Sequence, residues 1–132
     1  MKENQIHLEI ELSVNSENLY SDWLDSKAHS LFTGGEANIN KKVNSAFTCW
    51  DGYISGTIKE LQPKKRILHN WRTSEFIEQD KDSSLEVLFK HLSAKKTLFV
   101  INHWNLSESD VEKYKSGWIE HYINPMKKFY KL

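Results

Sequence analysis

The stretch VEKYKSGWIEHYINPMKKFYKL, from Val111 to Leu132, decides the fold. Its large apolar side chains recur at intervals of three or four residues, which is the spacing of one face of an α-helix. The members of this stripe are Val111, Tyr114, Trp118, Tyr122, Pro125, Phe129 and Leu132. We therefore predict a long amphipathic helix with an aromatic face. A capping box at Ser107 to Asp110 precedes it, and a kink or break is expected at Pro125, which removes one backbone hydrogen bond.

Most of the remaining chain has the pattern of β-strands. From Ile6 to Val14 apolar and polar residues alternate, which indicates a strand with one buried face. Five further segments have strand character, and the turn sequences between them are short, so we expect consecutive strands to pair antiparallel. These segments are Lys42 to Trp50, Tyr53 to Gln62, Lys65 to Ser74, Ser84 to Leu92 and Lys96 to Trp104.

Two short helices are predicted between the first strand and the others. Asn15 and Ser16 are suitable N-cap residues, and apolar residues follow at helical spacing as far as Leu24. A second helix should end at Gly34-Gly35, because glycine readily adopts the left-handed conformation found at helix ends. The apolar face of the sheet needs a cover, and the C-terminal helix is the only element of matching length. We expect an α+β fold in which a curved, antiparallel, six-stranded sheet wraps around that helix.

Composition favours an ordinary cytoplasmic domain. A length of 132 residues fits one domain, residues 1–132, and the formal net charge of +0 gives little attraction to nucleic acid or an anionic membrane. The single cysteine, Cys49, excludes a disulfide within the chain and suits a reducing compartment. Residues 1–5 are polar, and neither a signal peptide nor a membrane span is recognisable.

Several short sequence motifs along the chain resemble those of one known superfamily. They are FTGGEA, WDGYISGTIKEL, KRILHNWRTSEF, TLFVINHWN and GWIEHYINPMKKF, in that order. This set is similar to the SRPBCC (START-like, helix-grip) superfamily, and within it to homologues of the C-terminal domain of the heat-shock protein 90 ATPase activator. The resemblance implies a START/Bet v-like helix-grip fold. It also implies a groove between sheet and helix that binds hydrophobic or amphipathic small molecules.

The residues themselves also predict a cavity. Gly52 and Gly56 stand where the sheet should bend, and a bent sheet does not pack flush on a straight helix. Strand parity and helical spacing select the side chains that face this space. The candidate ligand-binding residues are Trp23, Phe32, Phe47, His69, Trp71, Thr73, Phe89, His103, Trp118 and Tyr122. The rings would hold an apolar body, and His69, Thr73 and His103 would meet its polar end. The same side chains would also suit an ordinary core, which is the commoner role of a strand tryptophan and of an inward histidine.

Three functions are compatible with the sequence. The first is a module that binds one hydrophobic, amphipathic or lipid-like small molecule. The second, which rests on the resemblance, is a partner of a heat-shock protein 90 type chaperone ATPase. The third is a cyclase or hydrolase that uses His69 or His103 as a general base. We expect no metal or other cofactor and assign no catalytic residue, because no clustered ligands, nucleophile elbow or phosphate loop is found.

Overall fold

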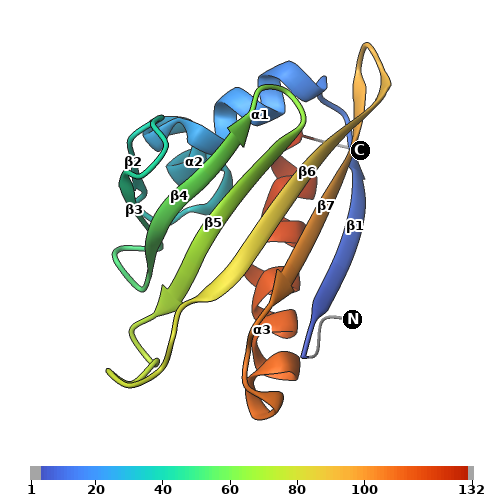
Figure 1. Cartoon of the computed structure of the whole chain (residues 1–132). Helices are drawn as coiled ribbons and strands as arrows, with labels where there is room; N and C mark the ends of the chain where they lie inside the picture. Colours follow the sequence, from blue (N-terminus) through green and yellow to red (C-terminus); the bar gives the residue numbers. More distant parts are fainter. Residues whose placement is uncertain (1–3, 131–132) are drawn as a thin grey trace.

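A seven-stranded antiparallel sheet bends around a C-terminal helix in the computed structural model, which describes residues 4–130 (Figure 1). The sheet order is β1-β7-β6-β5-β4-β3-β2. The strands are β1 (Ile6–Leu12), β2 (Asn38–Ile39), β3 (Ala46–Cys49), β4 (Ile54–Gln62), β5 (Arg66–Thr73), β6 (Ser83–Ser93) and β7 (Lys96–Trp104). The helices are α1 (Ser16–Leu24), α2 (Ser26–Thr33), α3 (Val111–Trp118) and α4 (Asn124–Tyr130). The α+β helix-grip prediction is confirmed.

The prediction of six strands missed β2. This strand has two residues and lies in a polar run without alternation, so it left no signal in the sequence. Ser26 of α2 holds it in place. The hydroxyl of Ser26 accepts from the backbone N–H of Ile39 at 2.8 Å and donates to its carbonyl at 3.2 Å. The next strand, β3, also begins later than predicted, because residues 42–45 form a turn in which Asn44 has a φ of 68°.

The two short helices are those predicted, and local side chains explain their ends. The carboxamide of Asn15 accepts a hydrogen bond from the N–H of Asn18 at 2.8 Å, which caps α1. Asp25 caps α2 in the same way through the N–H of Ala28. The second helix ends at Gly34, which has a φ of 89°, so the glycine pair stops the helix as expected.

A close approach of two strands explains why β4 contains a glycine. A Cβ on Gly56 would lie 1.9 Å from the carbonyl oxygen of Asn70, so only glycine fits there. The pairing of β4 with β5 then shifts by one residue between Ile58 and Glu60, which marks a β-bulge. Bulges bend a strand and increase its twist, so β4 curves at this point.

The inward-facing residues predicted from strand parity form the core, which lies between the sheet and the helices. In the predicted apolar stripe of the C-terminal helix, Val111 and Pro125 are only half-buried and Phe129 is 44% exposed. The buried members are Trp23, Phe32, Ile67, His69, Trp71, Thr73, Leu85, Val87, Phe89, Phe99, Ile101, His103, Tyr114, Trp118 and Tyr122. The alternation of buried and partly buried residues along β5 is complete, as expected for a strand with one face on the core.

The C-terminal helix comprises α3, a π-helical turn at Ile119–Ile123 (the π-turn) and α4. The N–H of Asn124 donates to the carbonyl of Ile119, five residues earlier. Pro125 follows directly, and a wide turn moves carbonyl groups away from its ring, which would clash with the carbonyl four residues before it in a regular helix. The irregularity expected at Pro125 is therefore this turn. The last member of the predicted stripe, Leu132, lies outside the described residues.

The capping box predicted at the start of this helix is wrong. Ser107 makes no side-chain capping bond, and a single 3-10 turn at Glu108–Asp110 leads into α3 instead. Within residues 4–130, no helix is long and apolar enough to cross a membrane.

Candidate functional site

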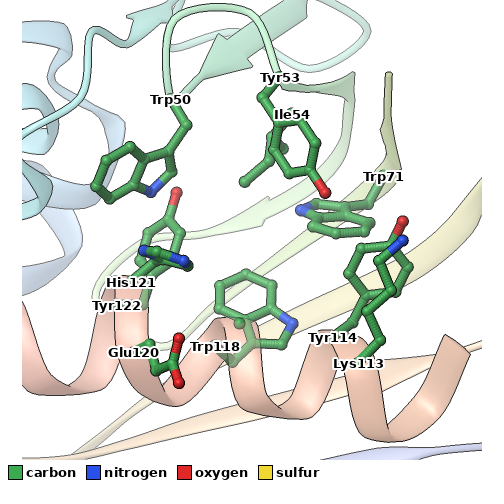
Figure 2. Close-up of a pocket in the computed structure, with 11 residues that line it drawn as sticks. Trp50, Tyr53, Ile54, Trp71, Lys113, Tyr114, Trp118, Glu120, His121 and Tyr122 are labelled. Atoms are coloured by element: carbon green, nitrogen blue, oxygen red, sulfur yellow. The ribbon is translucent and has the colours of Figure 1, made fainter. Parts of the chain in front are cut away.

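A pocket with a volume of about 420 Å³ lies between the C-terminal helix and the part of the sheet where β4 starts and β5 ends (Figure 2). Its walls are mainly aromatic. The lining residues are Trp50, Tyr53, Ile54, Trp71, Lys113, Tyr114, Gly117, Trp118, Glu120, His121 and Tyr122. Lys113, Glu120 and His121 are exposed, so charged and polar groups surround the mouth while rings form the interior. This distribution is usual for a small-molecule site.

One wall depends on a left-handed turn between β3 and β4. Trp50, Asp51 and Gly52 have φ values of 51°, 58° and 89°. For the first two residues this conformation costs about 1–2 kcal/mol each. The carboxylate of Asp51 accepts from the N–H of Glu36 at 2.9 Å, which ties the turn to the segment after α2. A Cβ on Gly35 would lie only 2.5 Å from the indole of Trp50. The absence of a side chain at Gly35 therefore leaves the space that seats Trp50.

The opposite wall depends on the π-turn. This turn places three consecutive residues, Glu120, His121 and Tyr122, in the lining of the pocket. The ring of His121 meets the indole of Trp50 edge to face, with 5.3 Å between centroids. Since π-helical turns occur frequently at functional sites, the wide turn supports the assignment of this pocket as the site.

One end of the pocket is bridged by Glu75, which lies in the loop between β5 and β6. The hydroxyl of Tyr53 donates to one carboxylate oxygen, and the ammonium group of Lys113 pairs with the other. Lys113, and then Tyr53, lower the pKa of Glu75, and Glu75 in turn raises the pKa of Lys113. The bridge thus links β4, the loop and α3 across the mouth.

Beneath the pocket the interior is closed. The space next to Tyr122 and His69 has a volume of only about 10 Å³. That volume is at the lower limit for one water molecule. The hydroxyl of Tyr122 donates to Nε2 of His29 at 2.8 Å, and Nδ1 of His29 donates to the carbonyl of Trp23 at 2.8 Å. Burial lowers the pKa of His29 to about 4, so this histidine is neutral at pH 7.

Cys49 lies beside this network, with its Sγ 3.5 Å from Nε2 of His29. Burial raises the pKa of the thiol to about 12, so the thiol stays protonated at neutral pH. Because the thiolate is the reactive form, Cys49 is not a nucleophile in the folded protein.

The predicted site residues are distributed over three places. Trp71, Trp118 and Tyr122 line the open pocket, and the same three residues also border the closed inner space. Trp23, Phe47 and His69 border only the inner space. The remaining four are buried elsewhere in the core: Phe32, Thr73, Phe89 and His103. Thr73 supports the pocket from behind, because its hydroxyl is hydrogen-bonded to that of Tyr114 at 2.8 Å. A role of these residues in binding stays a prediction.

In both histidines proposed as general bases, each ring nitrogen makes a hydrogen bond within the protein. In His69, Nε2 accepts from the indole of Trp23 at 3.1 Å and Nδ1 donates to the carbonyl of Leu85 at 3.3 Å. In His103, Nδ1 accepts from the indole of Trp118 at 3.0 Å and Nε2 donates to the hydroxyl of Ser83 at 2.7 Å. Burial lowers the pKa of each imidazole to about 3. Neither ring lines the open pocket, so these positions give general-base catalysis no support.

Sequence reasoning missed most of the pocket lining. Trp50 and Tyr53 entered the sequence analysis only as the bounds of predicted strands, and the left-handed turn that directs Trp50 into the wall was not anticipated. Glu120 and His121 lie off the predicted aromatic stripe, and only the π-turn brings them into the lining. The signal that could have found them is Pro125, because a proline inside a helix requires an irregular turn just before it.

The described residues contain no group of three or more histidine, cysteine, aspartate or glutamate side chains able to hold a metal ion. The lining itself supplies rings that can bury an apolar body, an indole N–H that can donate a hydrogen bond, and charge at the mouth.

Solved structures with the same fold include an HSP90 activator from Plasmodium falciparum, which is 22% identical, with a TM-score of 0.84 over 95% of this chain and 94% of that one. CalU16 from Micromonospora echinospora is 19% identical, with a TM-score of 0.81 over 96% and 76% of the two chains. The Aha1 dimer from Colwellia psychrerythraea is 11% identical, with a TM-score of 0.78 over 96% of each chain.

No curated protein sequence matches the chain. Residues 13–131 match the family described as "Activator of Hsp90 ATPase homolog 1-like protein". This match covers most of the helix-grip fold, from the residue after β1 through the C-terminal helix. The chain therefore belongs to the Activator of Hsp90 ATPase homolog 1-like protein family.

Proposed function

We propose that this protein binds one hydrophobic or amphipathic small molecule in the pocket between the sheet and the C-terminal helix. The observation that carries the proposal is an open space of about 420 Å³ with six aromatic residues among its lining. A volume in the range of roughly 300–1,000 Å³ is typical of sites for drug-sized ligands. The family and the fold are compatible with such a role.

The energetics of the pocket support an occupant. At about 24 cal/mol per Å³, an empty apolar cavity of a few hundred cubic ångströms costs several kcal/mol, which is comparable with the stability of a small domain. Because this pocket opens to solvent, water relieves part of that cost, but apolar walls hold water poorly. A ligand that replaces the water with ring contacts would therefore stabilise the fold and raise its melting temperature.

The proposal is tested with ligands and with one residue of the lining. Native mass spectrometry of the protein from its source organism would reveal a co-purified ligand. Titration with fatty acids and polycyclic aromatic compounds would then be followed by tryptophan fluorescence. We expect saturable binding and a higher melting temperature with at least one of these classes. The absence of both a co-purified ligand and any response across the panel would overturn the proposal.

Gly117 offers a matched pair of variants. It lines the pocket, and no heavy atom lies within 4 Å of a Cβ placed on it, so larger side chains at this position enter free space. Gly117→Phe should fill the pocket and abolish binding, whereas Gly117→Ala should leave binding intact. Both replacements suit a helix better than glycine does, so loss of fold does not explain a difference between them. Equal binding by the two variants would place the ligand elsewhere.

A second candidate function is association with a chaperone ATPase of the heat-shock protein 90 type. Membership of the family favours it, although family alone does not establish a partner. The test is the ATPase activity of the source organism's chaperone with this protein at tens of micromolar, a concentration at which a pair with a binding free energy of about −7 kcal/mol associates. Stimulation that survives in Gly117→Phe would assign the partner to a surface other than the pocket.

A further inference from the structure

Two indole N–H groups at the pocket have no acceptor among the described residues. Nε1 of Trp50 is buried and unpartnered. Trp71 is 3% exposed; its carbonyl accepts from the hydroxyl of Ser83, but no described residue accepts from its Nε1. Figure 2 shows the indole nitrogen of Trp71 directed toward the space enclosed by the lining residues. An unpaired buried donor is costly, and a phenylalanine would fill the wall at Trp50 without that cost.

The other polar groups of the lining are engaged within the protein. The indole of Trp118 donates to His103, and the hydroxyl of Tyr122 donates to His29. Likewise, the hydroxyl of Tyr53 donates to Glu75, and that of Tyr114 is hydrogen-bonded to Thr73. The interior of the pocket therefore offers Nε1 of Trp71 as a free donor, and Nε1 of Trp50 lies unpaired and buried in the wall. The carboxylate of Glu120 and the imidazole of His121 are exposed at the mouth.

The unpaired hydrogen-bond donors restrict the chemical class of ligand that the pocket can bind. A group that only donates, such as an ammonium, would leave the indole donors unpaired, and a plain hydrocarbon chain would do the same. Flat walls made of Trp50, Tyr53, Trp71, Tyr114 and Trp118 favour a flat conjugated body, because offset stacking contributes beyond the area buried. The complementary ligand therefore combines fused rings with oxygen acceptors on its edges.

We propose that the pocket selects an aromatic carbonyl compound, such as an aryl ketone or a quinone, whose oxygen accepts a hydrogen bond from Nε1 of Trp71. A second oxygen would accept from Nε1 of Trp50 after the exposed ring of His121, which packs against that indole, turns aside. This inference rests on the proposed function and narrows the class of ligand.

Anthracene and 9,10-anthraquinone form a matched pair of probes, since they share a three-ring outline and only the second carries carbonyl oxygens. Protein labelled with ¹⁵N gives one indole N–H signal for each of its five tryptophans, and Trp50→Phe and Trp71→Phe assign the two signals of interest. Trp23 and Trp118 serve as internal controls, because their indoles already donate to histidines.

We expect anthraquinone to bind roughly three- to tenfold more tightly than anthracene, the factor that one neutral hydrogen bond provides. The indole proton of Trp71 should move downfield with anthraquinone only, while a hydrogen-bond shift is absent at Trp23 and Trp118. In Trp71→Phe the smaller ring should weaken the binding of both probes, and the ratio of the two affinities should shrink by the same factor, because only anthraquinone uses the indole N–H. If this variant does not fold, the comparison of the two probes on the native protein and on Trp50→Phe decides the matter.

Two results separate the inference from the function beneath it. Equal affinities for the two probes, or binding of fatty acids but not of anthraquinone, would overturn the acceptor inference while the binding module stands. If anthracene, anthraquinone and fatty acids all fail to bind, both the inference and the proposed function are refuted.

Discussion

Acidification should unfold this protein at a pH where most small domains remain stable, because three histidines are buried in neutral form. The pKa of His29 is lowered to about 4, and those of His69 and His103 to about 3, chiefly by burial. In the unfolded chain each imidazole returns to a pKa of about 6.5. All three rings have both nitrogens occupied by hydrogen bonds that fit the neutral tautomer, as described above.

The direction of the change in stability with pH depends on whether the folded or the unfolded state binds more protons. Above pH 6.5 both states leave these rings uncharged, so their contribution to stability does not vary with pH. Below pH 6.5 the unfolded chain takes up protons that the folded protein does not accept, and the free energy of unfolding falls as the pH falls. The loss per histidine approaches about 1.4 kcal/mol per pH unit, and integrated from pH 7 to pH 5 it is about 2 kcal/mol. The three together remove roughly 5–6 kcal/mol over that interval.

One exposed histidine acts in the opposite direction. Asn102, and then Glu9, raise the pKa of His7, so its contribution to stability is fully present below pH 6.5 and is lost as the pH rises through its folded pKa. Since the side chain of His7 is about half exposed, solvent screens this term and it offsets only a small part of the loss.

The assay is urea-induced unfolding at pH 7.0, 6.0, 5.5 and 5.0 and constant ionic strength, followed by tryptophan fluorescence and circular dichroism. Staying at or above pH 5 keeps carboxylate titration to a minor role. In His69→Gln and His103→Gln the difference in unfolding free energy between pH 7 and pH 5 should shrink by about one third each, whatever the absolute stability of the variant. A native-protein loss below about 1.5 kcal/mol, or equal losses in all variants, would refute the reasoning.

Three further outcomes are expected. Gly56→Ala places a Cβ 1.9 Å from the carbonyl oxygen of Asn70 and should lower the free energy of unfolding by about 3 kcal/mol. Gly117→Ala lies in open space on a helix and should raise the free energy of unfolding by about 0.5–1 kcal/mol. A Gly56→Ala variant as stable as the native protein in urea titrations would contradict this geometry. The thiol of Cys49 should react with a disulfide reagent only after unfolding, since it is buried with its pKa raised to about 12, and rapid labelling of the folded protein would count against that burial. Asn15→Ala should lower the free energy of unfolding by about 1 kcal/mol and Asn15→Asp by much less, because only the first removes the cap of α1. Equal melting temperatures of the two variants would show that the cap contributes nothing to stability.

Much of the fold could be predicted because its signals are local. The alternation from Ile6 to Val14 gave β1, and strand parity identified His69 and Trp71 as inward-facing. The two-residue strand β2 could not be predicted, because its place depends on hydrogen bonds from Ser26, which is distant in sequence. Pairing through such side chains leaves no periodicity for sequence analysis to detect.

The site was harder to predict than the fold because backbone irregularities create it. Trp71, Trp118 and Tyr122 follow regular periodicity, and the sequence identified them. Trp50 lines the pocket because it adopts a left-handed φ, which is uncommon for any residue except glycine. His121 lines it because a wide turn interrupts the helix. Periodicity assumes regular elements, so it assigned neither of them to the site.

The wide turn also makes the lining of the pocket depend on a residue that lies outside it. Pro125 is absent from the pocket lining, yet it is the residue that a regular helical turn could not accommodate at this point. A turn closed by a bond to the fifth preceding residue holds one more amino acid than an ordinary turn, and that extra residue brings Glu120 and His121 into the lining of the pocket. Replacing Pro125 should therefore let this segment wind as an ordinary helix and withdraw both side chains from the lining, although Pro125 is not part of it.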